Sequence, residues 1–347
     1  MTPYTEDYSD LKRQLNAFLR TELGEKISLV GDLSRLRGGF DTDTYAFTVE
    51  NAAADFPRQM VLRHFQTARE SGRVITESTI QNAAYAAGHA VPRVPIDSTG
   101  HLINKRYFLL MERLPGKALG TQLEDPSVLQ QLPGLMANTQ VGLHGIDSTG
   151  LYKQLAKSGV DVERMAPGAM LFRISVIADA ANEKKLSAVN EWLINNMPDQ
   201  PEKPVICHGD FHPNNILYVD GKVTGVIDWG NAMFTHAEFD VAITHLTMSI
   251  GPPELDAETR KAMQPTIDSL LAGYLASYRK QRPLDNDLLV YYGALRSAHA
   301  YAKVIGARAK LDVPYIAGDG YAWGHPLLFN TISRVIETAT GVTLGTA

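Results

Sequence analysis

A short polar stretch near the middle of this 347-residue chain constrains the fold more than any other feature. It reads HGDFHPNN from His208 to Asn215 and lies between two apolar, β-prone runs, Val205–Cys207 and Ile216–Val219. A second acid, Asp228, follows thirteen residues after Asn215. The Asp220-Gly221 pair between the second run and residues 223–227 predicts a tight hairpin turn, which would bring Asp228 back toward Asn215.

The spacing of these polar residues suits phosphoryl transfer. One carboxylate, Asp210, can face an attacking hydroxyl, while the Asn215 amide and the Asp228 carboxylate can hold a magnesium ion that neutralises phosphates. The order His-x-Asp-x-x-x-x-Asn, hairpin, Asp-x-Gly is that of a kinase catalytic loop and its metal-binding strand. Asp and Asn are also common turn residues, but all these elements in order predict a phosphotransferase.

Composition limits the other classes of function. A net charge of -5 and a pI near 6.1 give no electrostatic reason to expect nucleic acid or an anionic membrane as a partner. Residues 1–10 are polar and acidic, and no apolar run approaches a membrane span, so we expect a cytoplasmic protein. Cys207 is the one cysteine, which predicts a buried structural thiol and no disulfide-linked partner.

The hydrophobic pattern predicts an α+β chain of two lobes. Residues 1–113 combine short strands (27–30, 33–37, 45–49, 60–63 and 107–111) with helices at Ser9–Leu23 and 71–87. Residues 114–347 are helical apart from the catalytic hairpin. The expected helices are 128–144, 169–197 (as two), 237–248, 257–281 with a kink near Pro265, 285–309 and Pro326–Thr340. We expect the first lobe to bind nucleotide and the second to hold the catalytic and acceptor sites.

Together these residues resemble the aminoglycoside phosphotransferase and choline kinase-like family of small-molecule kinases, which has the protein-kinase-like fold. The resemblance runs from about Leu36 to the C-terminus and is sharpest at residues 208–215. It implies ATP or GTP and Mg²⁺ as cofactors, with Asp210 as the catalytic carboxylate and Asn215 and Asp228 as metal ligands.

The same resemblance implies supporting roles around the loop. Asp240, in the sequence EFDVA, would support the catalytic loop from behind. His208 would brace the loop by hydrogen bonds, and His212 would lie near the transferred phosphate. Neither histidine is expected to bind the metal.

The nucleotide-facing residues match the family less sharply. Gly38 and Gly39 stand where a loop would cover the phosphates, although two glycines also suit an ordinary hairpin. Arg63 falls at the place of a phosphate-binding lysine, with Glu77 as its ion-pair partner, and a solvated surface pair is the alternative. By position alone, the Glu112 carbonyl and the Leu114 N–H would read adenine between the lobes.

Two departures from protein kinases point to a small acceptor. Gly209 replaces the arginine that would receive an activation-loop phosphate, and only eleven residues separate Asp228 from Asp240, too few for a peptide-docking segment. From Asn231 onward the chain has eleven acidic and ten basic residues together with several aromatics, which favours a neutral or weakly charged hydroxylated acceptor. The aromatics include Tyr291, Tyr292, Tyr301, Tyr315, Tyr321, Trp323 and Phe329, and ordinary core packing is the alternative for Tyr291, Tyr301 and Trp323.

Two alternatives stay open at this point. A cationic acceptor, either an aminoglycoside or a choline-type alcohol, would need local acidic or aromatic clusters that an overall charge count does not detect. A kinase-fold binding protein with little turnover would lack one of Asp210, Asn215 or Asp228, and this chain has all three.

Overall fold

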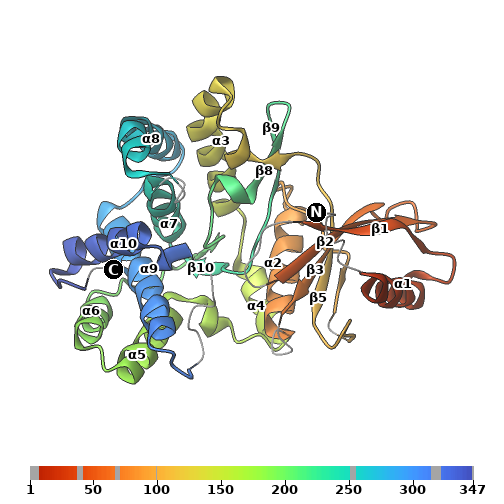
Figure 1. Ribbon diagram of the computed structural model, residues 1–347, viewed down its shortest axis with the longest axis horizontal. Helices are drawn as coiled ribbons and strands as arrows, with labels where there is room; N and C mark the ends of the chain where they lie inside the picture. The colour runs from red at the N-terminus through yellow and green to blue at the C-terminus, as the bar shows by residue number, and fades with distance from the viewer. Residues whose placement is uncertain are drawn as a thin grey trace, which may run out of the picture. The chain divides into compact units, whose positions relative to one another are not determined.

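The structure is a computed structural model that describes residues 8–36, 42–66, 71–98, 100–250, 255–313 and 322–345. The chain divides into two compact units (Figure 1). The first consists of Met1–Gly116, Gln154–Val160 and Leu217–Ile227, and the second contains the remaining residues. The lobe boundary between residues 113 and 114 stays a prediction. The first unit also includes two segments from later in the chain, Gln154–Val160 and Leu217–Ile227.

A five-stranded antiparallel sheet forms the centre of the first unit, and Figure 1 shows most of its strands side by side. The strand order is β1-β2-β3-β5-β4. The strands are β1 (Ser28–Leu36), β2 (Thr42–Glu50), β3 (Gln59–Phe65), β4 (Ile96–Asp97) and β5 (Phe108–Glu112). The two strands predicted at 27–30 and 33–37 correspond to one strand, β1, over residues 28–36, and residue 37 lies outside the described residues. A register shift between Val30 and Ser34 interrupts its pairing with β2, which explains the break in its pattern.

Two helices cover opposite faces of this sheet because strand side chains alternate between the faces. Leu62 and Leu110 pack with helix α1 (Ser9–Leu23) in one apolar cluster. Phe65 and Leu109 pack with helix α2 (Ser71–Ala86) in another. The alternation also places Arg63 on the α2 face, since it lies two residues before Phe65 on the same strand.

The β8–β9 hairpin belongs to this first unit from Leu217 onward. It joins β8 (Ile216–Val219) to β9 (Lys222–Val226) through Asp220 and Gly221, whose φ values are 49° and 81°. Two positive φ values match the right-handed twist of a two-residue hairpin, as the Asp-Gly pair predicted.

The second unit is mainly helical and is built around α9 (Asn286–Arg308), which packs against α5, α7 and α10. The helices are α3 (Pro126–His144), α4 (Thr149–Lys157, whose end belongs to the first unit), α5 (Pro167–Ala181), α6 (Lys184–Asn195), α7 (Ala237–Ile250), α8 (Ala257–Arg279) and α10 (Pro326–Thr340). Helix α8 continues across Pro265. The sequence pattern missed α4 and the three-residue strand β10 (Met233–Thr235), because a segment this short shows little periodicity.

We predict that Leu15→Ala lowers the free energy of unfolding of the first unit by about 2–5 kcal/mol, because it leaves a cavity under the sheet. Leu15 is fully buried in the α1 cluster, whereas Leu23 at the end of the same helix is 38% exposed. Leu23→Ala is therefore the matched control, with an expected change within about 0.5 kcal/mol. Urea unfolding followed by circular dichroism measures both, and equal losses would contradict the packing described for α1.

Candidate active site

The polar loop at residues 208–215 begins where strand β7 ends. Strand β7 (Val205–Cys207) pairs with β10 in antiparallel register, so the loop leaves a fixed, buried strand. His208 is fully buried, its ring meets Trp229 edge-on at 4.8 Å between centroids, and its Nδ1 accepts a hydrogen bond of 3.3 Å from the Asp210 N–H. The histidine therefore lies inside the loop as a brace and not at its surface.

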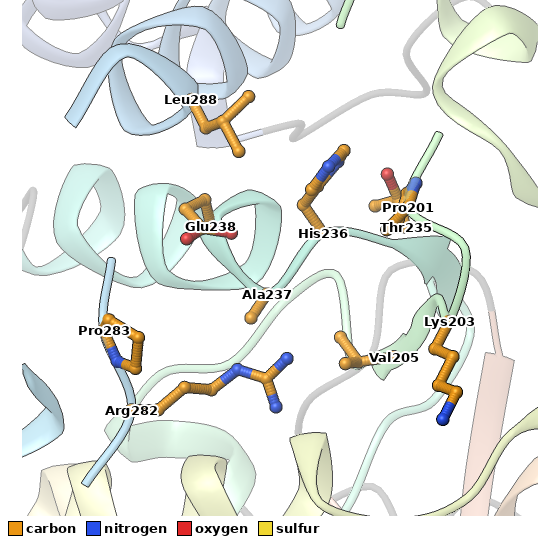
Figure 2. Close-up of a pocket in the computed structure, with 10 residues that line it drawn as sticks. All are labelled: Pro201, Lys203, Val205, Thr235, His236, Ala237, Glu238, Arg282, Pro283 and Leu288. Carbon is orange, nitrogen blue, oxygen red and sulfur yellow. The ribbon is translucent and has the colours of Figure 1, made fainter. Parts of the chain in front are cut away.

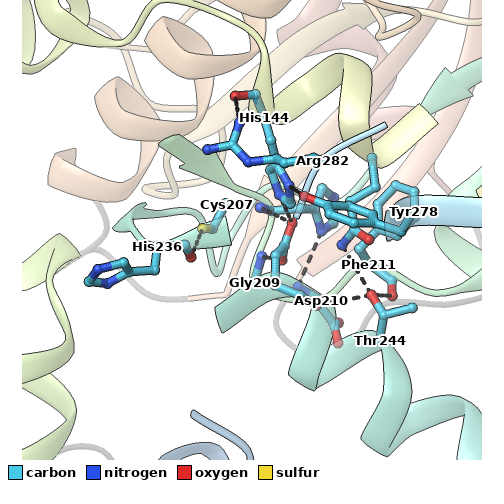
Figure 3. A network of polar contacts seen from close by, with 12 residues as sticks. His144, Cys207, Gly209, Asp210, Phe211, His236, Thr244, Tyr278 and Arg282 are labelled. Atoms are coloured by element: carbon cyan, nitrogen blue, oxygen red, sulfur yellow. Dashed lines mark hydrogen bonds and ion pairs between the residues drawn. The ribbon is translucent and has the colours of Figure 1, made fainter. Parts of the chain in front are cut away.

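Asp240, on the first turns of α7, holds the loop from the other side. Its Oδ2 accepts a hydrogen bond from the His208 N–H at 2.9 Å, and its Oδ1 accepts one from the Gly209 N–H at 2.7 Å (Figure 3). Both carboxylate oxygens are thus used by the loop backbone. Burial alone would raise the pKa of Asp240, but the hydrogen bond from His144, together with the contribution of His208, outweighs burial and lowers it.

His144 extends this network into the helices. Its Nε2 donates to Asp240 Oδ2 at 3.1 Å, and its Nδ1 lies 2.6 Å from the Tyr278 hydroxyl, which donates to it. Arg282 donates to the His144 carbonyl oxygen at 3.1 Å, as Figure 3 shows. No sequence pattern pointed to His144, because 96 residues separate it from Asp240.

Asp210 and Asn215 contact each other within the loop. The side chain of Asp210 is 31% exposed, and the Asn215 Nδ2 donates to the Asp210 carbonyl oxygen at 2.9 Å. Because the amide nitrogen is engaged in this way, Asn215 has its Oδ1 available for a cation. His212 lies beside them, with its Nε2 3.8 Å from Asp210 Oδ2 and its Nδ1 accepting from the Asn214 N–H at 3.2 Å.

The pKa of Asp210 is lowered to about 2. Burial acts in the opposite direction, but the nearby His212 side chain, followed by Arg296 and His208, favours the carboxylate. Asp210 is therefore ionised throughout the physiological pH range. It can accept a hydrogen bond, and later a proton, from a hydroxyl.

Asp228 follows β9 in a backbone conformation that L-residues seldom adopt. Its φ is 68°, and the next residue, Trp229, is fully buried against His208. The buried Trp229 ring and the left-handed backbone of Asp228 together fix the direction of the chain at Asp228.

The donor set at this site suits magnesium better than a transition metal. In the described part of the chain, no cluster of three or more His, Cys, Asp and Glu side chains could hold a metal ion. Asn215 and Asp228 offer hard oxygen donors, and magnesium accepts one or two such ligands when phosphate oxygens and water complete its shell. The residues present therefore fit a magnesium ion held jointly with a nucleotide.

The nucleotide-facing residues lie in the first unit. Arg63 and Glu77 form an ion pair of 2.9 Å, with side chains 8% and 1% exposed, so a solvated surface pair does not describe them. Arg73, which the sequence pattern missed, also pairs with Glu77, at 2.7 Å. The sequence feature that could have indicated Arg73 is its position four residues before Glu77 on the same helix, where opposite charges can pair. Both guanidinium groups lie over the Phe65 ring.

The remaining predicted nucleotide contacts are main-chain groups. Gly38 and Gly39 lie outside the described residues. Glu112 ends strand β5 and its N–H donates to the Arg93 carbonyl at 2.8 Å, while Leu114 follows it and is partly exposed. The proposed use of the Glu112 carbonyl and the Leu114 N–H by adenine stays a prediction.

A separate pocket of about 370 Å³ lies in the second unit (Figure 2). It is bordered by β7, β10 and the start of α7, and its lining includes Lys203, Glu238 and Arg282. In Figure 2 the Arg282 guanidinium points toward Val205. The residues predicted to carry chemistry, Asp210, Asn215 and Asp228, do not line this pocket.

Comparison with known proteins identifies the family. The sequence profile of the phosphotransferase enzyme family (APH) matches residues 32–281, which is most of the chain. The chain belongs to this family. The family expected from the catalytic motif is confirmed, and the expected enzyme class, a small-molecule phosphotransferase, agrees with it.

Individual relatives in the family are distant. Acyl-CoA dehydrogenase family member 11 of Rattus norvegicus is 23% identical over 276 residues, which are 77% of this chain and 34% of that protein. Hygromycin-B 4-O-kinase of Escherichia coli is 24% identical over 238 residues, 63% of each chain. The chain thus spans about a third of the length of the first relative and less than two thirds of the second.

Solved structures confirm the α+β, protein-kinase-like fold of two lobes. A Ralstonia eutropha JMP134 protein assigned to the aminoglycoside phosphotransferases superposes with a TM-score of 0.66 at 15% identity, covering 96% of this chain and 99% of that one. A thermostable mutant of aminoglycoside phosphotransferase APH(4)-Ia, in ternary complex with ADP and hygromycin B, gives 0.56 at 18% identity, covering 93% and 98%. At such identities the likeness concerns the fold alone.

None of the helices in the described part of the chain combines the length and the apolar character that crossing a bilayer requires.

We predict that Gly209→Ala disrupts the loop, because its φ is 77° and an added Cβ would collide with the Asn231 carbonyl oxygen. Gly221→Ala is the matched control, since its φ is 81° and no atom lies within 4 Å of the added Cβ. The left-handed conformation should cost each variant about 1–2 kcal/mol, and the collision should cost Gly209→Ala about 1–3 kcal/mol more. Urea unfolding of the two variants measures this difference, and equal losses would show that the loop can move away from Asn231.

Proposed function

We propose that this protein is an ATP- and Mg²⁺-dependent O-phosphotransferase that acts on a hydroxyl group of a small molecule. The observation that carries the proposal is the carboxylate of Asp210, ionised and partly exposed on a loop that Asp240 holds by two backbone hydrogen bonds. This arrangement supplies what phosphoryl transfer asks of a protein, namely positioned groups and fixed charges.

Asp210 orients the acceptor in the proposed mechanism. Its Oδ atoms accept the hydrogen bond of the attacking hydroxyl, and the hydroxyl oxygen forms a bond to the γ-phosphorus as the bond to the β-phosphate oxygen breaks. Because the transition state is loose, the proton moves to Asp210 late, so a pKa of about 2 does not prevent the role. His212, 3.8 Å from Asp210 Oδ2, keeps the carboxylate in its ionised form before the reaction.

Asn215 and Asp228 would hold the magnesium ion through the Asn215 Oδ1 and the Asp228 carboxylate. When bound, the ion neutralises phosphate charge. Arg63, kept in place by Glu77, would add positive charge beside the nucleotide.

The relatives support a small hydroxylated acceptor. One is a hygromycin-B 4-O-kinase, and the structural neighbours include a complex with ADP and hygromycin B and a macrolide 2'-phosphotransferase type I. These names concern those proteins, and their acceptors differ widely in charge and size. The near balance of acidic and basic residues after Asn231 favours a neutral or weakly charged acceptor for this chain.

The direct experiment is a screen for ADP release with Mg·ATP across aminoglycosides, macrolides, choline-like alcohols, hydroxy acids and sugars. Turnover of a macrolide, a sugar or a hydroxy acid would support the proposal as stated. Efficient turnover of an aminoglycoside with a strongly salt-dependent KM would contradict the weakly charged acceptor and leave the kinase assignment intact, because salt screens exposed charge attraction.

We predict that Asp210→Asn lowers kcat by about 10²–10⁴, the contribution typical of a positioned acid–base group. The amide keeps the shape of the side chain but cannot take the proton. Affinity for Mg·ATP should stay within about twofold of the wild type, since the proposed mechanism gives Asp210 no part in holding the nucleotide. Steady-state kinetics and calorimetric titration of Mg·ATP measure the two quantities. A near-normal kcat would remove Asp210 from the mechanism.

We also predict that Asp228→Ala weakens Mg·ATP binding more than Asn215→Ala, because it removes a formal charge beside the cation. Asp199→Ala, which removes an exposed acid in the same unit, is the control and should leave affinity unchanged. Calorimetry with and without magnesium separates metal-dependent from metal-independent binding. If Asp228→Ala binds Mg·ATP as well as the control does, the carboxylate is not a metal ligand.

A further inference from the structure

Helix α9 carries a row of polar side chains along one face. Tyr292, Arg296, His299 and Lys303 recur at intervals of three and four residues, so they lie above one another on the helix. The row begins close to strand β10. The Tyr292 hydroxyl lies 2.8 Å from Nδ1 of His236, the residue that follows β10. Its two middle members are buried charged or polar groups that the proposed mechanism does not use.

Arg296 and His299 are 7% and 5% exposed and contact each other, with Arg296 Nη1 3.3 Å from His299 Nδ1. A guanidinium can only donate, so Nδ1 accepts and the proton of the neutral imidazole is on Nε2. Burial, followed by the charges of Arg296, Lys303 and Arg173, lowers the pKa of His299 well below its usual value. The ring is therefore neutral at pH 7 and its Nε2–H is a hydrogen-bond donor.

One donor of this pair has no acceptor in the described part of the chain, and its cation has no ion-pair partner there. His299 Nε2 is buried and has no hydrogen-bond partner among the described residues. Over the same residues, no carboxylate forms an ion pair with the Arg296 guanidinium, whose contact is the neutral His299 ring. A buried charge without an ion-pair partner and a buried N–H without an acceptor each destabilise the fold. An oxygen ligand with negative charge would satisfy both.

The pair also lies within electrostatic reach of the reacting carboxylate. Arg296 and Asp210 belong to the same compact unit, and α9 packs directly against α7, whose Asp240 holds the catalytic loop. After the opposing effect of burial and the larger effect of His212, the charge of Arg296 helps to lower the pKa of Asp210. A small acceptor can therefore present its hydroxyl to Asp210 and its other end to Arg296.

We propose that Arg296 and His299 form the anion-binding end of the acceptor site, so that the acceptor is a small alcohol bearing a carboxylate or a phosphate ester. The inference rests on the proposed kinase activity and specifies its substrate class. The Arg296 guanidinium matches two oxygens of either group, and the His299 Nε2–H can donate to one of them. The cationic end of an aminoglycoside would instead meet a like charge at this position.

The test uses hydroxylated chains of three and six carbons that end in a carboxylate, a phosphate, a carboxamide or an ammonium group. ADP release with Mg·ATP gives kcat and KM, and calorimetry on the full chain saturated with Mg·AMP-PNP gives binding without turnover. We expect the carboxylate or the phosphate member to exceed the carboxamide of equal length at least tenfold in kcat/KM, with the ammonium member lowest. The difference between the carboxylate and phosphate members identifies which anion the site takes.

Variants of Arg296 connect this preference to the residue. Arg296→Gln should raise KM for the anionic member about 10- to 100-fold, the range for a lost hydrogen bond to a charged group, and abolish its advantage over the carboxamide. Arg296→Lys keeps the charge but loses the planar fork, so its KM should fall between the two. Arg334→Gln removes an exposed arginine on α10 and is the control with unchanged kinetics. Melting temperatures of all three variants show whether each one is folded.

Several outcomes separate this inference from the proposed function. A preference for the carboxamide or the ammonium member, or an unchanged KM in folded Arg296→Gln, overturns the anionic acceptor while the kinase activity stands. Failure of every anionic member to bind the Mg·AMP-PNP-loaded protein overturns it as well. If the protein neither binds Mg·ATP nor releases ADP with any acceptor, the proposed function itself fails and the inference fails with it.

Discussion

The arrangement of the candidate site depends on the carboxylate of Asp240. It is fully buried, and its two oxygens accept the N–H groups of His208 and Gly209, the first two residues of the catalytic loop. A buried carboxylate is stable only with charge or hydrogen bonds around it, and His144 supplies the third contact. The loop therefore cannot move away from α7 without leaving that charge unpaired, and the position of Asp210 follows from this constraint.

Steric limits act on the same loop. Gly209 has a φ of 77° and no room for a Cβ beside the Asn231 carbonyl, so glycine is required there for local reasons. In protein kinases an arginine at this place receives an activation-loop phosphate. Glycine at this position has no side chain that could receive such a phosphate, and it allows the close contact with the Asn231 carbonyl. The backbone at Asp228 is constrained in a similar way, because its left-handed conformation lies next to the buried Trp229 ring.

Charge is unevenly distributed among the acceptor-side residues, although the overall count is balanced. Arg296 and His299 lie buried on α9, and Arg173 and Lys303 lie close enough to affect His299. A count of charged residues over the sequence does not distinguish such a buried cluster from exposed acidic residues elsewhere. This count favours a weakly charged acceptor but does not give the sign of its charge. The buried positions of Arg296 and His299 favour an acceptor that carries an anionic group as well as the hydroxyl.

The sequence by itself determined the family, the α+β fold class and most helices, and it supplied the proposal for the chemistry of residues 208–228, because these depend on local spacing that one motif and one hydrophobic period reveal. It also predicted the pairing of Arg63 with Glu77. It could not reveal His144, 96 residues before Asp240, or the convergence of Arg296 on the region of Asp210, because such contacts arise only when separate helices pack. Short elements such as β4 and β10 were missed for a related reason, since strands of two or three residues are defined by their partners. Tertiary structure thus decided which side chains support the loop and which charged groups are buried on α9, because burial and long-range contact fix both.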